Sequence, residues 1–128
     1  MKILLVEDNL MNQKVVMFNL KKLNLEIAPA VMGSEAIELF KNNQFSLVLM
    51  DIMLPEMDGY EITRAIREME KQNNIENPVP IIALTANTYD NDKEKCFNAG
   101  MNDYLSKPFT SKQLIDMIAK YLPVGTNE

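Results

Sequence analysis

Short apolar runs alternate with segments of helical periodicity along the whole chain. The clearest run, residues 47–54, has the composition of a strand buried on both faces, and it is interrupted by the carboxylate of Asp51 before Pro55 ends it. Such runs predict five strands, at residues 1–6, 25–30, 47–51, 78–84 and 102–106. Helical periodicity predicts five helices, at residues 10–23, 33–41, 59–71, 88–98 and 110–122. This alternation predicts an α/β fold, a doubly wound parallel five-stranded sheet flanked by five helices.

Single residues refine this arrangement. Pro29 cannot donate a backbone hydrogen bond, so it predicts either that the second strand lies at an edge of the sheet or that the strand ends there. Asp58 and Glu61 have the spacing of a capping box at the start of the third helix, whose polar face includes Arg67. Gly100 is suited to end the fourth helix.

The first helical segment has apolar residues on more than one face. The residues predicted to face the sheet are Asn12, Val15, Val16, Asn19, Leu20 and Leu23. An exposed stripe at helical spacing is then formed by Leu10, Gln13, Lys14 and Met17. Two interpretations stay open for this stripe: a contact surface for a partner helix, or scattered surface apolar residues without a function.

The length and charge of the chain limit its class. A chain of 128 residues suits one domain, which we assign to residues 1–122, with a flexible C-terminal tail at 123–128. The 18 acidic and 13 basic residues give a net charge of −5. This excess of acid argues against direct nucleic acid binding or membrane attachment through bulk electrostatics.

Two residue types narrow the chemistry further. The chain has no histidine, which excludes Ser-His-Asp and Cys-His nucleophilic systems and histidine-ligated zinc. Its single cysteine, Cys96, cannot form an internal disulfide, and the sequence has neither a signal peptide nor a long apolar segment. We therefore expect a cytoplasmic protein without membrane insertion.

Charged and hydroxyl side chains follow four of the five predicted strands, namely Glu7, Asp8, Asp51, Thr85 and Lys107. Because the carboxyl ends of parallel strands meet at one edge of the sheet, these side chains are expected to converge. Three carboxylates about 4 Å apart would repel one another by a few kcal/mol per pair, so a divalent cation and an ammonium are needed to offset them. Mg²⁺ prefers such oxygen ligands. The alternative is that each acid is only a helix cap or a solvated loop residue.

Nucleophilic attack by a carboxylate on phosphorus is the chemistry that fits this group, with Asp51 as the nucleophile and Lys107 neutralising the transferred group. The sequence contains no P-loop and no dinucleotide-binding motif. Phosphatases that resemble haloacid dehalogenases also use an aspartate at a strand end, but they have a second aspartate where this chain has Met53.

The sequence resembles the receiver domain of two-component response regulators over nearly the whole chain. The segments that carry the resemblance are Leu-Leu-Val-Glu-Asp-Asn at 4–9, Met-Asp-Ile-Met-Leu-Pro-Glu-Met-Asp-Gly at 50–59, Ala-Leu-Thr-Ala at 83–86 and Lys-Pro-Phe at 107–109. Together with Asn12 and the segment at 100–108, they look most like receivers of hybrid sensor kinases and phosphorelays.

The resemblance implies a role for each of these positions. It implies that Asp51 is the phosphoacceptor, that Glu7, Asp8 and Asp51 bind Mg²⁺, and that the backbone carbonyl of Met53 is a further ligand. Thr85 and Lys107 would sense the phosphoryl group, Tyr104 would be the switch aromatic that follows Thr85, and a cis bond would precede Pro108.

The implied function is a phosphorylation-activated signalling switch of a two-component system or phosphorelay. Its donors would be histidine kinases or histidine phosphotransfer domains, docking on the surface formed by Leu10, Gln13, Lys14, Met17 and Pro108. The domain would act on no external substrate but would catalyse its own Mg²⁺-dependent phosphorylation and slow dephosphorylation. The alternative function is a protein-interaction module of the same fold that works without phosphorylation.

Overall fold

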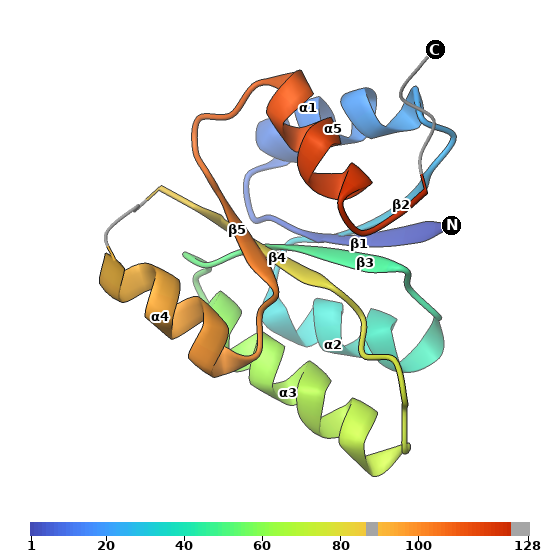
Figure 1. Cartoon of the computed structure of the whole chain (residues 1–128), viewed down its shortest axis with the longest axis vertical. Coiled ribbons are helices and arrows are strands. Elements are labelled where there is room, and N and C mark those ends of the chain that lie inside the picture. Colours follow the sequence, from blue (N-terminus) through green and yellow to red (C-terminus); the bar gives the residue numbers. More distant parts are fainter. Residues whose placement is uncertain (87–89, 124–128) are drawn as a thin grey trace.

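The computed structural model describes residues 1–86 and 90–123. Five parallel strands form a single sheet in the order β2-β1-β3-β4-β5, which confirms the predicted doubly wound fold (Figure 1). The strands are β1 Lys2–Val6, β2 Glu26–Ala30, β3 Leu47–Asp51, β4 Ile81–Thr85 and β5 Asp103–Ser106. Strand β2 is at the edge, which is one of the two alternatives that its proline predicts. The tail expected from residue 123 onward lies outside the described residues except for Pro123.

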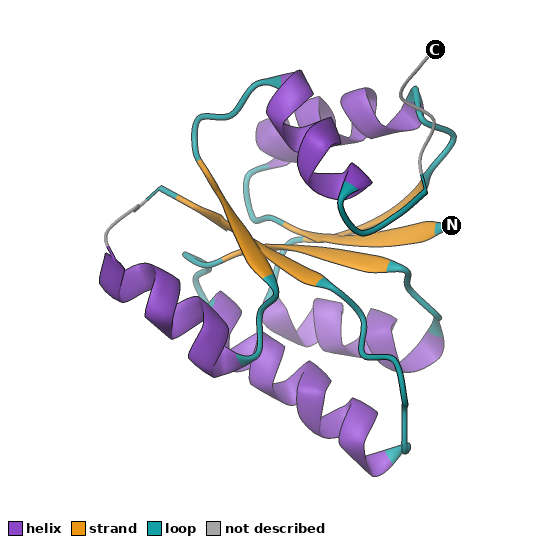
Figure 2. Ribbon diagram, in the orientation of Figure 1, coloured by secondary structure: helices purple, strands orange, loops and turns teal. Residues whose placement is uncertain are grey.

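Helices cover both faces of the sheet. They are α1 Leu10–Lys21, α2 Gly33–Asn42, α3 Gly59–Gln72, α4 Asp90–Ala99 and α5 Ser111–Ala119. Figures 1 and 2 show α1 and α5 on one face and α2, α3 and α4 on the other. Helices α1 and α5 end two to three residues before their predicted ends, and the predicted start of the fourth helix at residue 88 lies outside the described residues. None of the helices in the described ranges is long and apolar enough to cross a membrane.

Local signals in the sequence explain where the helices begin and end. The Asp58 carboxylate accepts from the backbone N–H of Glu61, and the Glu61 side chain accepts in return, which confirms the capping box at α3. An equivalent box is present at α5. Gly100 follows α4 with a φ of 108°, a backbone conformation that a side chain would disfavour.

The core has two halves, one on each face of the sheet. Every residue of β3 is buried, and alternate residues of β1 and β3 point to opposite faces. Towards α2, α3 and α4 the core contains Leu4, Val6, Val48, Met50, Ile62, Ile66 and Cys96. Towards α1 and α5 it contains Ile3, Leu5, Leu47, Leu49, Val16, Leu20, Leu114 and Ile118. The burial of Cys96 agrees with a packing role.

The buried face of α1 differs from the predicted one. Gln13 is buried together with Val16 and Leu20, so its predicted place in an exposed stripe is wrong. Val15, predicted to face the sheet, is 57% exposed. Apolar residues occur all around this helix, so the sequence pattern alone could not fix which side faces the sheet.

Arg67 is half-buried, although the sequence predicted it on the polar face of α3. Its guanidinium donates to the carbonyls of Gly100 and Val79 and to the carboxylate of Glu70, at 2.7 to 2.9 Å. It also donates to the Asn102 side chain. The buried Glu70 carboxylate accepts in addition from the Val79 N–H at 2.7 Å. Through these hydrogen bonds, the ion pair of Arg67 and Glu70 connects α3 with the residue after α4 and with the segments that lead into β4 and β5.

We expect Arg67→Met to lower the free energy of unfolding by about 3 kcal/mol, because the substitution leaves the Glu70 carboxylate buried without its cation. Urea denaturation measures this loss. The exposed Arg64 on the same helix provides the control, since Arg64→Met should change stability by less than about 0.5 kcal/mol. Equal urea midpoints for the two variants would contradict a structural role for Arg67.

Candidate functional site

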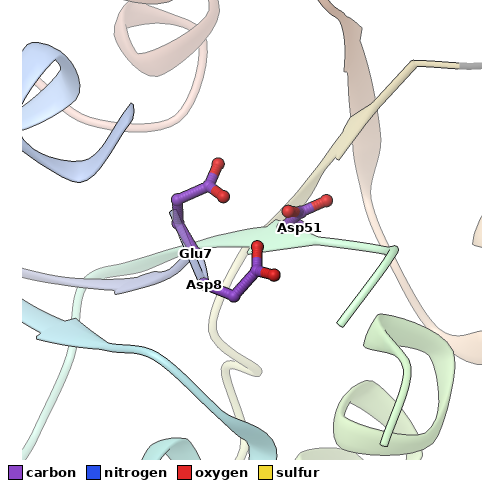
Figure 3. Close-up of side chains that lie close together, drawn as sticks. All are labelled: Glu7, Asp8 and Asp51. Carbon is purple, nitrogen blue, oxygen red and sulfur yellow. The ribbon is translucent and has the colours of Figure 1, made fainter. Parts of the chain in front are cut away.

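Three carboxylates converge at the carboxyl edge of the sheet. Glu7 and Asp8 directly follow β1, and Asp51 is the last residue of the neighbouring strand β3 (Figure 3). Each contributes one oxygen to a group whose members all lie within 4.8 Å of one another. Glu7 and Asp51 are buried, whereas Asp8 is exposed. The convergence predicted from the strand ends is therefore confirmed for the acids.

Lys107, which follows β5, supplies a positive charge to this group. Its Nζ lies 3.1 Å from Glu7 Oε1 and 3.3 Å from Asp51 Oδ2, and the predicted cis bond joins Lys107 to Pro108. Burial by itself lowers the pKa of the Lys107 ammonium. The attraction of Asp51, together with the hydrogen bond and attraction of Glu7, outweighs this effect and leaves the pKa above its ordinary value.

The backbone around Asp51 is tightly constrained. The N–H of Met53 donates to Asp51 Oδ1 at 3.2 Å, and Met53 itself is 72% exposed. Gly59, at the start of α3, donates its N–H to the Ile52 carbonyl. A Cβ atom at Gly59 would lie 2.6 Å from the Asp51 carbonyl oxygen, so only glycine fits without a shift of the backbone.

The predicted switch residues lie beside the acidic group and along β5. Thr85 is buried at the end of β4, and its carbonyl accepts from the Lys107 N–H at 2.7 Å. Tyr104 is half-buried on the face of the sheet covered by α4, where the Lys93 ammonium lies 5.2 Å from its ring centre. Their predicted movement on phosphorylation stays a prediction.

The acidic group has the chemistry of a magnesium site. Three carboxylates and one ammonium give a formal charge of −3 + 1 = −2, which a divalent cation balances. The oxygen donors are those that Mg²⁺ prefers, and the exposure of Asp8 leaves one side of the group open to water and to a phosphate. The residues present therefore fit Mg²⁺.

Apolar side chains adjoin the acidic group on the surface of α1. Leu10, Lys14 and Pro108 are exposed as predicted, and Met17 is half-buried. The sequence reasoning missed two further exposed apolar residues of the helix, Met11 and Val15, and Phe18 is exposed as well. A signal was present, since α1 contains apolar residues on every side and no acidic residue.

An open hollow of about 460 Å³ lies between α1 and the segment that carries Lys107. Its lining extends from the acidic group to the apolar surface of the helix and consists of Glu7, Asn12, Val15, Val16, Ala86, Lys107, Pro108 and Phe109. A partner that contacts the exposed part of α1 would thus also lie beside the acidic group.

Comparison with protein families matches residues 3–119 to the response regulator receiver domain. The chain belongs to this family. This assignment agrees with the resemblance seen in the sequence. The acids, the threonine and the lysine of the resembling segments all lie at the carboxyl ends of the strands. The chain is thus a receiver domain of two-component and phosphorelay signalling systems.

Relatives of this receiver domain include hybrid histidine kinases. It is 50% identical over 129 residues to the hybrid signal transduction histidine kinase B of Dictyostelium discoideum, covering 94% of this chain and 7% of that kinase. It is 38% identical to the peroxide stress-activated histidine kinase mak2 of Schizosaccharomyces pombe, covering 93% of this chain and 5% of the kinase. The chain therefore spans less than a tenth of the length of these two relatives.

Two solved structures are similar to this receiver domain over most of their length. The receiver domain of Saccharomyces cerevisiae Ssk1, crystallised with the histidine phosphotransfer protein Ypd1, has a TM-score of 0.90 and 36% identity, covering 94% of this chain and 88% of that one. The receiver domain of the sensor histidine kinase PA1611 from Pseudomonas aeruginosa, with magnesium in its active-site cleft, has a TM-score of 0.82 and 42% identity, covering 94% and 95%.

The raised pKa of Lys107 makes part of the stability depend on pH. Folding favours the charged lysine, so this contribution is complete below the ordinary pKa of 10.5 and is lost as the pH rises through the raised value. We expect the difference in urea midpoint between wild type and Lys107→Met to narrow above pH 10.5. Lys41→Met, at an exposed position, controls for general lysine titration. A difference that stays constant up to strongly alkaline pH would refute this coupling.

Proposed function

We propose that this receiver domain accepts a phosphoryl group on Asp51 from a phosphohistidine of a partner protein, and that this modification switches its signalling state. The observation that carries the proposal is the buried Asp51 carboxylate beside two further acids and within 3.3 Å of the Lys107 ammonium. Because the chain contains no histidine, the phosphohistidine has to belong to another domain. We place the reaction in the cytoplasm, as expected from the sequence.

In this reaction a carboxylate oxygen of Asp51 attacks phosphorus, and the bond between phosphorus and the histidine nitrogen breaks. The electron pair of that bond stays with the imidazole. Lys107 is placed to bind a phosphoryl oxygen and to neutralise the negative charge that the phosphoryl group brings to the site. Slow hydrolysis of the aspartyl phosphate by water releases inorganic phosphate and restores Asp51.

Glu7, Asp8, Asp51 and the Met53 carbonyl would hold Mg²⁺ in the phosphorylated and unphosphorylated states. When bound, the cation supplies positive charge to the transferred oxygens. Glu7 keeps one carboxylate oxygen on the Asn9 N–H, at 3.2 Å, and the other on Lys107. These contacts fix the direction of its carboxylate before any ligand arrives.

The switch itself would involve Thr85 and Tyr104. Thr85 ends β4 one residue after Leu84, which lies opposite Asp51, and Tyr104 lies opposite Ala83 on the next strand. A phosphoryl group on Asp51 can shift the population only by contacts it makes better in one state, and the Thr85 hydroxyl and Lys107 are the groups that can provide them. Movement of Tyr104 would carry the change to the surface around α4 and β5.

The partner surface of this proposal is the exposed part of α1, formed by Leu10, Met11, Lys14, Val15 and Phe18, together with Pro108. The occupant we propose is a helical histidine phosphotransfer domain or the equivalent part of a histidine kinase. Support comes from the similar receiver domain that was crystallised with such a protein. The hollow beside Lys107 would bring the partner's histidine next to Asp51.

We expect Asp51→Asn to abolish phosphate uptake, because the amide is not a nucleophile for phosphorus. The wild-type protein, incubated with Mg²⁺ and acetyl phosphate, should gain one phosphate by intact-mass spectrometry. Asp116→Asn, at a surface position of α5, should gain it at the wild-type rate. An Asp51→Asn protein phosphorylated as fast as wild type would refute Asp51 as the phosphoacceptor. A wild-type protein that gains no phosphate would instead support the alternative, an interaction module that works without phosphorylation.

We expect Val15→Glu to slow phosphoryl transfer from phosphorylated Ypd1 by on the order of tenfold, because a charge replaces an apolar contact next to the site. Uptake from acetyl phosphate, which needs no docking surface, should remain at the wild-type rate. Ile75→Glu changes an exposed apolar residue far from the acidic group and should affect neither reaction. Equal slowing of both donors would exclude a docking role for Val15.

A further inference from the structure

We propose that Gln13 is a positioning residue that sets the Mg²⁺ affinity of the acidic group by holding the peptide unit between Glu7 and Asp8. This inference rests on the magnesium site of the proposed function and assigns a role to a residue that makes no contact with the metal-binding oxygens. Gln13 lies in the first turns of α1 and is only 5% exposed.

The geometry of two consecutive acids creates the need for such a residue. Successive side chains of a strand point to opposite faces of the sheet. Glu7 and Asp8 nevertheless place carboxylate oxygens in one group with Asp51. The backbone therefore leaves strand geometry at Glu7, the residue that follows β1.

Hydrogen bonds show where this departure occurs. The Glu7 N–H still donates to the Ala30 carbonyl at 2.9 Å, as a continuing strand would do. The Glu7 carbonyl instead accepts from Gln13 Nε2 at 2.8 Å, and the same nitrogen donates to the Ala30 carbonyl at 3.1 Å. A side-chain amide has two N–H groups, so both are used, and they join the ends of β1 and β2.

The hydrogen bond to Glu7 positions the backbone of Asp8. A peptide unit is planar, so fixing the carbonyl oxygen of Glu7 also fixes the Asp8 N and Cα, and with them the point from which the Asp8 side chain leaves the backbone. The Glu7 carboxylate has its own anchors in Asn9 and Lys107. Gln13 is thus placed to act mainly on Asp8, the exposed acid of the group.

The test measures Mg²⁺ binding by isothermal titration calorimetry. Gln13→Met keeps the side-chain length and removes both donors, so the dissociation constant for Mg²⁺ should rise by on the order of tenfold. Mg²⁺ should also raise the melting temperature of the wild type, and the variant should need about tenfold more Mg²⁺ to reach the same rise. Gln13→Asn, which keeps an amide but is one methylene shorter, should have an intermediate dissociation constant and guards against a misfolded methionine variant.

Asn43 provides the matched control, because its side-chain amide also donates to a backbone carbonyl, that of Leu39 at 3.0 Å, but at the opposite edge of the sheet. Asn43→Leu should lower the melting temperature without changing the Mg²⁺ dissociation constant more than about twofold. If both Gln13 variants lose stability but bind Mg²⁺ as the wild type does, Gln13 is only structural and the inference is overturned. A wild-type protein that binds no Mg²⁺ would instead refute the magnesium site of the proposed function.

Discussion

The charge balance at the carboxyl edge of the sheet is the constraint on which the rest of the structure depends. Two buried carboxylates, Glu7 and Asp51, and one exposed carboxylate, Asp8, lie together, and Lys107 partly offsets their repulsion. This arrangement requires β1 and β3 to be neighbours, because the acids come from these two strands. It also requires the segment after β5 to reach back across the end of β4. The parallel sheet is the scaffold that brings together groups a hundred residues apart in the chain.

Irregular backbone at the strand ends turns this scaffold into a site. A regular strand would send the side chains of Glu7 and Asp8 to opposite faces of the sheet, so the chain has to turn between them. The turn takes the Glu7 carbonyl out of the sheet, and Gln13 donates a hydrogen bond to it. On β3 the corresponding features are the hydrogen bond from Met53 to Asp51 and the close approach of Gly59. The acids proposed to react or to bind metal are thus positioned by residues that have neither role themselves.

A second polar network lies at the amino ends of the strands, on the side of the sheet away from the acidic group, and it stabilises the fold. There Arg67 and Glu70 bind the segments that lead into β4 and β5, and Arg67 also binds the Gly100 carbonyl just after α4. Helix α4 is therefore anchored at the end remote from the acidic group. Since α4 also contributes Lys93 to the ring of Tyr104, the surface proposed to respond to phosphorylation includes a helix that is fixed at its far end.

The sequence by itself determined the five strands and five helices, their parallel arrangement, and the acids that meet at one edge. These features depend on short-range information: apolar runs, helix caps, and residues placed where strands end. Only the tertiary structure decided that Gln13 is buried, that Arg67 is half-buried and bonded to backbone carbonyls, and that Val15 is exposed. The reason is physical, because a polar side chain is buried when backbone carbonyls from other elements are there to accept its hydrogen bonds, and those carbonyls are brought to it only by the folded chain.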